Sequence, residues 1–80
     1  MNKQVQEAAE REVIKAITAD EHANAHYYQT LRHFVTDKSV KPEAKLDSAG
    51  LKTIDTAWIK LNDTNKNLRR AYMKLYGAYL

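Results

Sequence analysis

Three histidines in the first half of the chain come nearest to a metal site in residue type and spacing. His22 and His26 are four residues apart, so on a helix both imidazoles would project from the same side and could bind one metal ion. His33 would lie about 10 Å further along the helix axis, too far to complete that site. A metal or pH sensor is therefore one alternative function, with His22 and His26 as weak candidate ligands. We favour surface histidines, with no metal and no cofactor.

A row of basic side chains in the second half is the best candidate for a nucleic-acid contact. Helical spacing places Lys66, Arg70 and Lys74 on one side, about 6 Å apart along the axis, with Lys52 further back. Cations at this spacing can follow the phosphates of a nucleic acid. Residues 38–80 carry nine basic and four acidic side chains, which is a modest excess of positive charge. A nucleic-acid-associated regulator that uses this row is a second alternative function.

Residues for catalysis are not evident. The chain contains no cysteine, no glycine-rich phosphate loop and no nucleophile motif. No stretch approaches the ~18 apolar residues that a membrane span needs, and the N-terminus lacks an apolar signal core. We therefore expect a cytoplasmic, non-enzymatic protein with no catalytic residue and no membrane contact.

The elements that would position these side chains are helices. The 80 residues suffice for one domain, and their single proline and two glycines suit long helices better than a turn-rich β fold. Two ladders of residues spaced seven apart run through the second half: Ile54, Leu61, Leu68 and Leu75, and Trp58, Asn65, Tyr72 and Tyr79. Spacings that alternate between four and three form a continuous stripe on one side of a helix, as in a coiled coil. The first half has a similar stripe: Val13, Ile17, Tyr27, Tyr28, Leu31, Phe34 and Val35.

The two stripes predict an all-α fold, an antiparallel hairpin of helices over about 3–37 and about 51–77. A connector over 38–50 would contain a short helix from Pro42 to Ala49, because proline suits a first helical turn and Gly50 suits a C-terminal stop. The alternative is one helix running straight through Gly50. That alternative is less favourable, because Leu46 would then leave the apolar stripe.

The register of the hairpin is predicted from the polar interruptions of the two stripes. Aligning the helices with Leu31 beside Trp58 also brings Asn24 beside Asn65. A buried asparagine pair would select one register, because any slip leaves an amide facing leucine. The other interpretation is that both asparagines are half-exposed.

Aromatic and apolar side chains exceed what two helices can cover. We predict a face for a partner or for self-association, made of Tyr27, Tyr28, Trp58, Ile59, Tyr72, Met73, Tyr76 and Tyr79. Pairing two hairpins into a helical bundle, as a homodimer, would cover such rings, and so would a different protein partner. The competing interpretation is a monomer in which the connector folds back over the excess.

In size and layout the chain resembles the helical-hairpin copy-control proteins of plasmids, which pair two hairpins. This resemblance concerns architecture alone and implies an antiparallel helical hairpin. The function that we favour from sequence is a small non-enzymatic interaction protein, an accessory or regulatory factor of the phage, plasmid or immunity type. It would act by docking to itself or to another protein.

Overall fold

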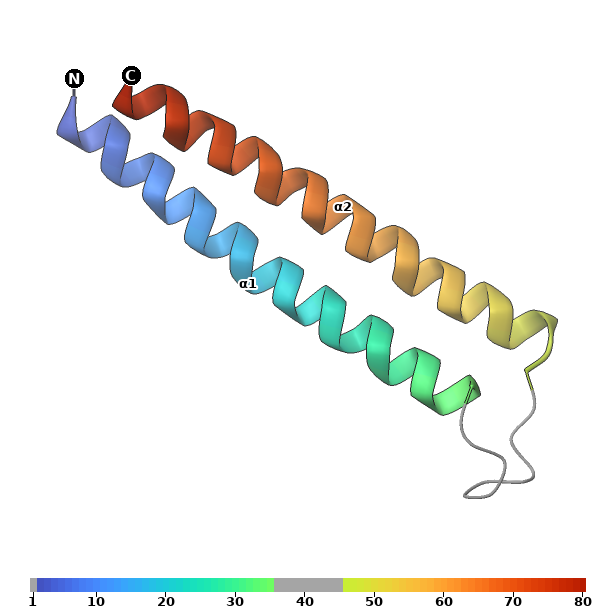
Figure 1. The fold of residues 1–80 in the computed structure, drawn as a ribbon. Helices are drawn as coiled ribbons and strands as arrows, with labels where there is room; N and C mark the ends of the chain where they lie inside the picture. The colour runs from blue at the N-terminus through green and yellow to red at the C-terminus, as the bar shows by residue number, and fades with distance from the viewer. Residues whose placement is uncertain (1, 36–45) are drawn as a thin grey trace.

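The protein is an antiparallel pair of long helices, as the hydrophobic stripes predicted. The computed structural model describes residues 2–35 and 46–80. In these ranges it contains α1 (Lys3–Phe34) and α2 (Ser48–Tyr79), each of 32 residues, and no strand. The helices lie side by side along their whole length, with the two termini at one end (Figure 1). The predicted all-α helical hairpin is thereby confirmed.

Side-chain caps explain where each helix begins. The Asn2 side chain accepts a hydrogen bond of 2.8 Å from the amide of Gln4 at the start of α1. The Asp47 side chain accepts one of 2.7 Å from the amide of Gly50 at the start of α2. Each cap satisfies an amide that has no partner within the first helical turn.

The predicted helix bounds need correction at the connector. Gly50 is not a helix stop: it lies within the first turn of α2, which begins at Ser48 rather than near Leu51, and its φ is not positive. The reason is the Asp47 cap, a stronger start signal than the stop that glycine offers. α1 ends at Phe34 rather than near 37, and α2 continues to Tyr79. Of the predicted short helix from Pro42 to Ala49, residues 42–45 lie outside the described residues. The rest of that prediction is wrong, because residues 46 and 47 are not helical and residues 48 and 49 belong to α2.

The contact between the helices, here called the seam, follows a strict seven-residue repeat. Its members in α1 are Gln6, Ala9, Val13, Ala16, Asp20, Ala23, Tyr27, Thr30 and Phe34. Its members in α2 are Gly50, Ile54, Ala57, Leu61, Thr64, Leu68, Ala71, Leu75 and Ala78. All of these residues are buried or half-buried, and the most buried of them are small. The spacings alternate between three and four, as expected for helices packed with their axes nearly parallel.

Apart from the layer of Asp20 and Thr64, each layer of the seam pairs a small residue with a larger one. Phe34 packs on Gly50, and the Gln6 amide donates a hydrogen bond of 3.2 Å to the Ala78 carbonyl. In the same register Ala23 of α1 faces Leu61 of α2. In this layer the small residue belongs to α1, whereas in the layer of Phe34 and Gly50 it belongs to α2. Such alternation fills the space between two helices without voids or clashes.

The predicted second ladder, Trp58, Asn65, Tyr72 and Tyr79, lies beside the seam rather than in it. All four side chains are exposed, and the residues one position before them, Ala57, Thr64, Ala71 and Ala78, lie in the seam instead. The physical reason is size, because a small residue on one helix leaves room for the larger residue of the other. The leucine ladder of α2 is half-buried in the seam as predicted.

The predicted register is also wrong, by five residues. Asp20 faces Thr64, whereas the prediction placed Arg69 at that level. Asn24 and Asn65 are therefore displaced from one another by about 7.5 Å along the axis, at 1.5 Å per residue. Both asparagines are exposed, so neither selects the register within the hairpin.

A polar pair in the seam, Asp20 with Thr64, takes the place of the predicted asparagines. The Thr64 hydroxyl lies 2.8 Å from the Asp20 carboxylate and 2.9 Å from the Leu61 carbonyl. A hydroxyl has one proton to donate, and the charged carboxylate is the stronger acceptor. Thr64 is buried and Asp20 half-buried, so this bond holds a polar group that would otherwise lose water without compensation.

We expect Thr64→Val to lower the free energy of unfolding by about 1–2 kcal/mol, because it leaves the Asp20 carboxylate without its donor in the seam. The matched control is Thr56→Val, where the hydroxyl is exposed and bonds to the Lys52 carbonyl of its own helix. Urea unfolding of both variants at one protein concentration gives the comparison. Equal midpoints for the two would show that the Asp20–Thr64 bond contributes nothing.

Candidate protein-interaction face

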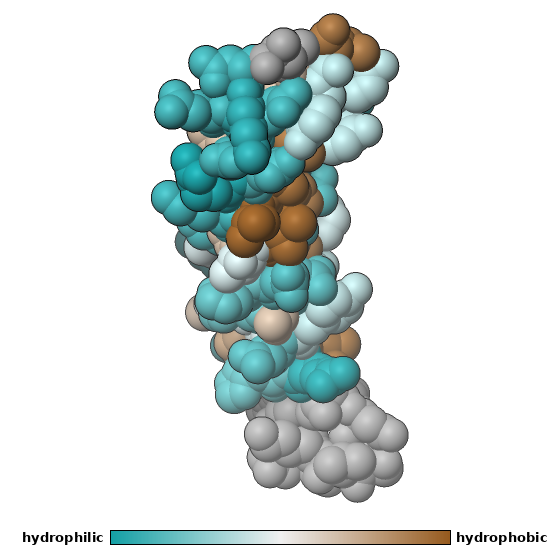
Figure 2. Space-filling model, turned by 90° about the vertical axis from the view of Figure 1, so that its left-hand side faces the viewer, coloured by the Kyte–Doolittle hydropathy of each residue, from teal (hydrophilic) through white to brown (hydrophobic). Residues whose placement is uncertain are grey.

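One side of the hairpin carries most of its large apolar side chains. In an antiparallel helix pair, residues that directly follow a seam residue project to the same side from both helices. The exposed members of this apolar face are Ile14, Ile17, Tyr28, Val35, Leu51, Trp58, Tyr72, Tyr76 and Tyr79. Leu31 also belongs to it and is half-buried. Figure 2 shows apolar side chains gathered into a patch on one side of the molecule, framed by polar ones.

Aromatic rings form a cluster at the connector end of the apolar face. The half-buried Tyr27 has its ring centroid 5.2 Å from Trp58 and 5.9 Å from Tyr28, with tilted planes. Tilted rings at these distances attract one another beyond the area that they cover. Trp58 still exposes 45% of its surface. The cluster is therefore held in one arrangement while much of it faces outward.

At the end with the termini, Tyr79 crosses from α2 to α1 and donates a hydrogen bond to the Glu10 carboxylate. This bond and the negative charge of Glu10 raise the pKa of Tyr79 above its ordinary value of 10.0, and Glu7 adds to the effect. The contact keeps the last turn of α2 beside α1 on the apolar face.

Titration of the tyrosines should show this coupling directly. A pKa raised in the folded state means that the protonated hydroxyl adds stability below pH 10.0, and this stability is lost as pH rises through the folded pKa. We expect Glu10→Gln to bring the pKa of Tyr79 toward its ordinary value, because the charge is removed. Tyrosinate absorbance, with Tyr79→Phe identifying the signal and Glu21→Gln as the control, measures this. An unchanged titration curve in Glu10→Gln would contradict the coupling.

Six of the eight residues predicted for the interaction face lie on or beneath the apolar face. They are Tyr27, Tyr28, Trp58, Tyr72, Tyr76 and Tyr79. Ile59 and Met73 lie elsewhere: each is two positions from a seam residue on either side, about 200° away from the seam. Both are exposed on the outer ridge of α2, and Met73 is surrounded by basic side chains, Lys66, Arg69, Arg70 and Lys74.

Sequence reasoning missed the aliphatic part of the face, because the predicted stripe placed Ile17 and Val35 in the contact between the helices and did not include Ile14. Ile14, Ile17 and Val35 are exposed by 62%, 41% and 58%. The signal that separates face from seam was present in the sequence as two further seven-residue ladders of small residues. They are Ala9, Ala16, Ala23 and Thr30 in α1, and Gly50, Ala57, Thr64, Ala71 and Ala78 in α2.

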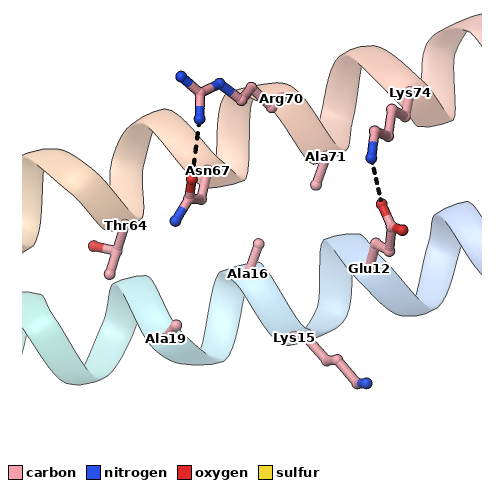
Figure 3. A pocket seen from close by; sticks show the side chains of 9 residues that line it. All are labelled: Glu12, Lys15, Ala16, Ala19, Thr64, Asn67, Arg70, Ala71 and Lys74. Carbon is pink, nitrogen blue, oxygen red and sulfur yellow. Dashed lines mark hydrogen bonds and ion pairs between the residues drawn. The ribbon is translucent and has the colours of Figure 1, made fainter.

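The opposite side of the hairpin is a shallow groove with small residues at its floor. One open hollow of about 390 Å³ has Ala16, Ala19 and Ala71 at its base (Figure 3). The Lys74 ammonium lies 3.5 Å from the Glu12 carboxylate across the groove, with both side chains more than half exposed. An exposed ion pair of this kind contributes about 0–1 kcal/mol.

Of the four residues predicted to contact nucleic acid, Lys66, Arg70 and Lys74 line one hollow together with Arg69 and Met73, and Lys52 lies apart from them. Lys52 and Lys66 lie on the outer ridge of α2, whereas Arg70 and Lys74 line the groove. Lys74 is paired with Glu12, and the Arg70 guanidinium donates a hydrogen bond of 3.5 Å to the Asn67 side chain (Figure 3). The Glu12 charge offsets the attraction that Lys74 would have for phosphate.

The three histidines lie on the groove side, away from the apolar face. His22 and His26 are exposed and line a hollow together with Lys60. Within 2–35 and 46–80, no group of three or more histidine, aspartate or glutamate side chains could hold a metal ion. His33 packs its ring edge-on against Phe34, with centroids 4.7 Å apart.

Comparison of the chain with known protein families, with curated proteins and with solved structures finds no match. Among the described residues, neither helix has an apolar stretch long enough to cross a bilayer. The apolar face is thus the feature of the molecule from which a function can be argued.

Proposed function

We propose that this chain is a non-catalytic interaction protein that docks a partner protein on its apolar face. The observation that carries the proposal is the number of large apolar side chains left outside the seam. The seam buries its small residues and half-buries its leucine ladder, while isoleucine, tyrosine and tryptophan side chains stay exposed on one side. A chain folded for itself alone would place the large side chains inside, because burying them stabilises a fold most.

The dimensions of the molecule support the same proposal. The Cα atoms extend over 59 × 21 × 14 Å with a radius of gyration of 17.9 Å, whereas a compact domain of this length has about 12 Å. The hairpin is one layer of helices thick, and stable domains are built from at least two packed layers. A partner on the apolar face supplies the second layer.

The composition of the face fits protein recognition better than any other contact. Tyrosine and tryptophan are the residues most enriched at protein interfaces, since each combines a wide apolar ring with one polar group. Four of them are exposed between Tyr28 and Tyr76, and their hydroxyl and indole groups can bond to water or to a partner at the rim.

Photo-cross-linking tests the proposal for a protein partner of any identity. A photoreactive amino acid at Tyr76 places the reactive group on the apolar face, and the matched control at Gln29 places it on the groove side. We expect protein adducts from position 76 and few from position 29, in cells that express the chain. Adducts from position 29 alone, or from neither position, would contradict the proposal.

A further inference from the structure

We propose that the partner is a second copy of this chain, packed face to face and antiparallel, so that the termini of each hairpin lie beside the connector end of the other. This inference rests on the proposed function of the apolar face. It adds the identity of the occupant and its orientation.

The surface available for burial is of the size that a stable dimer needs. The chain exposes 6407 Å², whereas a compact folded protein of 9.2 kDa exposes about 4,900 Å². The excess of about 1,500 Å², summed over the whole chain, is more than the roughly 800 Å² that each partner hides in an interface of standard size. One further hairpin laid along the apolar face can cover a part of it.

The apolar face has a polar middle between two apolar ends. Asn24 of α1 and Asn62 of α2 occupy one layer near its centre, with Glu21 and Asn65 in the next layer. Apolar side chains lie on both sides of these two layers along the helices. Toward the termini they are Ile14, Ile17, Tyr72 and Tyr76, and toward the connector they are Tyr28, Leu31, Val35, Leu51 and Trp58.

A two-fold axis through the Asn24–Asn62 layer, perpendicular to the helices, matches this asparagine layer with itself. It sets Asn24 opposite Asn24 and Asn62 opposite Asn62 of the second copy, while Ile17 meets Leu31. A lengthwise slip of one hairpin would separate both asparagine pairs. Polar residues at the centre of an otherwise apolar contact select register in this way.

Charge decides between the antiparallel and the parallel orientation. On the apolar face Arg69 lies on the terminal side of the asparagine layer and Asp55 on the connector side, about 21 Å apart along α2. In a parallel pair α2 would pack on α1 of the second copy, so Arg69 would face Ile17 and Asp55 would face Leu31. In the antiparallel pair Arg69 meets Asp55 twice, once at each end. A charge against an apolar side chain loses water without a partner, whereas the antiparallel pair joins opposite charges, so the antiparallel dimer is favoured.

A charge swap tests the orientation, because Arg69 and Asp55 are too far apart to contact within one chain. We expect Arg69→Asp to weaken the dimer at least about 10-fold, since the change acts at both ends of the interface. The double variant Arg69→Asp/Asp55→Arg should restore the dissociation constant to within about 3-fold. Sedimentation equilibrium at micromolar concentration measures each constant. No restoration by the second change overturns the antiparallel contact.

Distances between paramagnetic labels give an independent readout, and the chain has no native cysteine to interfere. Labels on Gln4→Cys lie at the terminal end, and labels on Ala49→Cys lie at the connector end, both at exposed positions off the apolar face. We expect distances between the two copies of about 60 Å for residue 4 and about 40 Å for residue 49 in the antiparallel dimer. Distances under about 30 Å for both would show a parallel dimer and overturn the proposal.

Failure of this inference is distinguishable from failure of the proposed function. A monomer at every concentration, together with adducts of position 76 to a different protein, overturns the second copy and leaves the docking function standing. A monomer with no adduct from position 76 overturns both. A dimer that cross-links to itself from position 76 and passes the charge swap supports both.

Discussion

Ala23→Leu is expected to lower the free energy of unfolding by about 1–3 kcal/mol, as added methyl groups do in a well-packed contact. Ala23 is 6% exposed and faces Leu61, so a leucine there has no space unless the helices separate. Separation would open the neighbouring layers too, because all of them depend on the same close approach. Urea unfolding at one protein concentration gives the change, and the concentration must be held constant because association adds to apparent stability.

Ala25→Leu is the matched control, with the same chemical change two residues away on the exposed side of α1. We expect its free energy of unfolding to stay within about 0.5 kcal/mol of the original chain. A second variant, Ala23→Leu/Leu61→Ala, exchanges the small and the large residue of one layer and should recover part of the loss. If Ala23→Leu and Ala25→Leu unfold at the same urea concentration, the small-with-large seam is wrong.

Alanine substitutions at the two glycines of α2 are expected to act in opposite directions. A Cβ at Gly50 would lie 2.8 Å from the Phe34 ring, whereas a Cβ at Gly77 would meet nothing within 4 Å. Both changes gain helix propensity, up to about 1 kcal/mol. At Gly77 this gain should appear almost whole, while at Gly50 the displacement of Phe34 should reverse it. We expect the two variants to differ by about 2–3 kcal/mol in the free energy of unfolding.

Replacing Phe34 provides the control for these two glycine substitutions. In a Phe34→Leu background the ring edge is gone, so Gly50→Ala should cost less there than in the original chain, while Gly77→Ala should have the same effect in both. Thermal unfolding followed by circular dichroism is sufficient for the comparison. A stabilising Gly50→Ala in the original chain would mean that Phe34 and Gly50 do not pack closely, and the observed register would then fail.

Most residues of the candidate site could be predicted from the sequence. Which residues lie in the seam and which lie on the apolar face could not. The surplus of aromatic residues over what two helices can cover predicted an interaction face, and six of its eight predicted residues lie on or under the apolar face. Ile59 and Met73 do not, because their placement depended on the angular position of the seam. Ile14 and Ile17 were missed for the same reason. Whether a partner covers this face stays a prediction.

The sequence by itself determined that the chain forms two long helices, that they lie antiparallel, and that Ile54, Leu61, Leu68 and Leu75 point inward. It did not determine which neighbouring ladder completes the seam. Residues 57 and 58 both fit the alternation of three and four around this leucine ladder, so periodicity favours neither, and hydrophobicity alone favoured Trp58. The tertiary structure chose Ala57, because the large residues of each helix need small residues opposite them. That choice turned the aromatic ladder outward and shifted the register by five residues. The apolar side of one helix can be predicted from its own repeat. The fit between two helices depends on the sizes of the side chains that face one another across the seam.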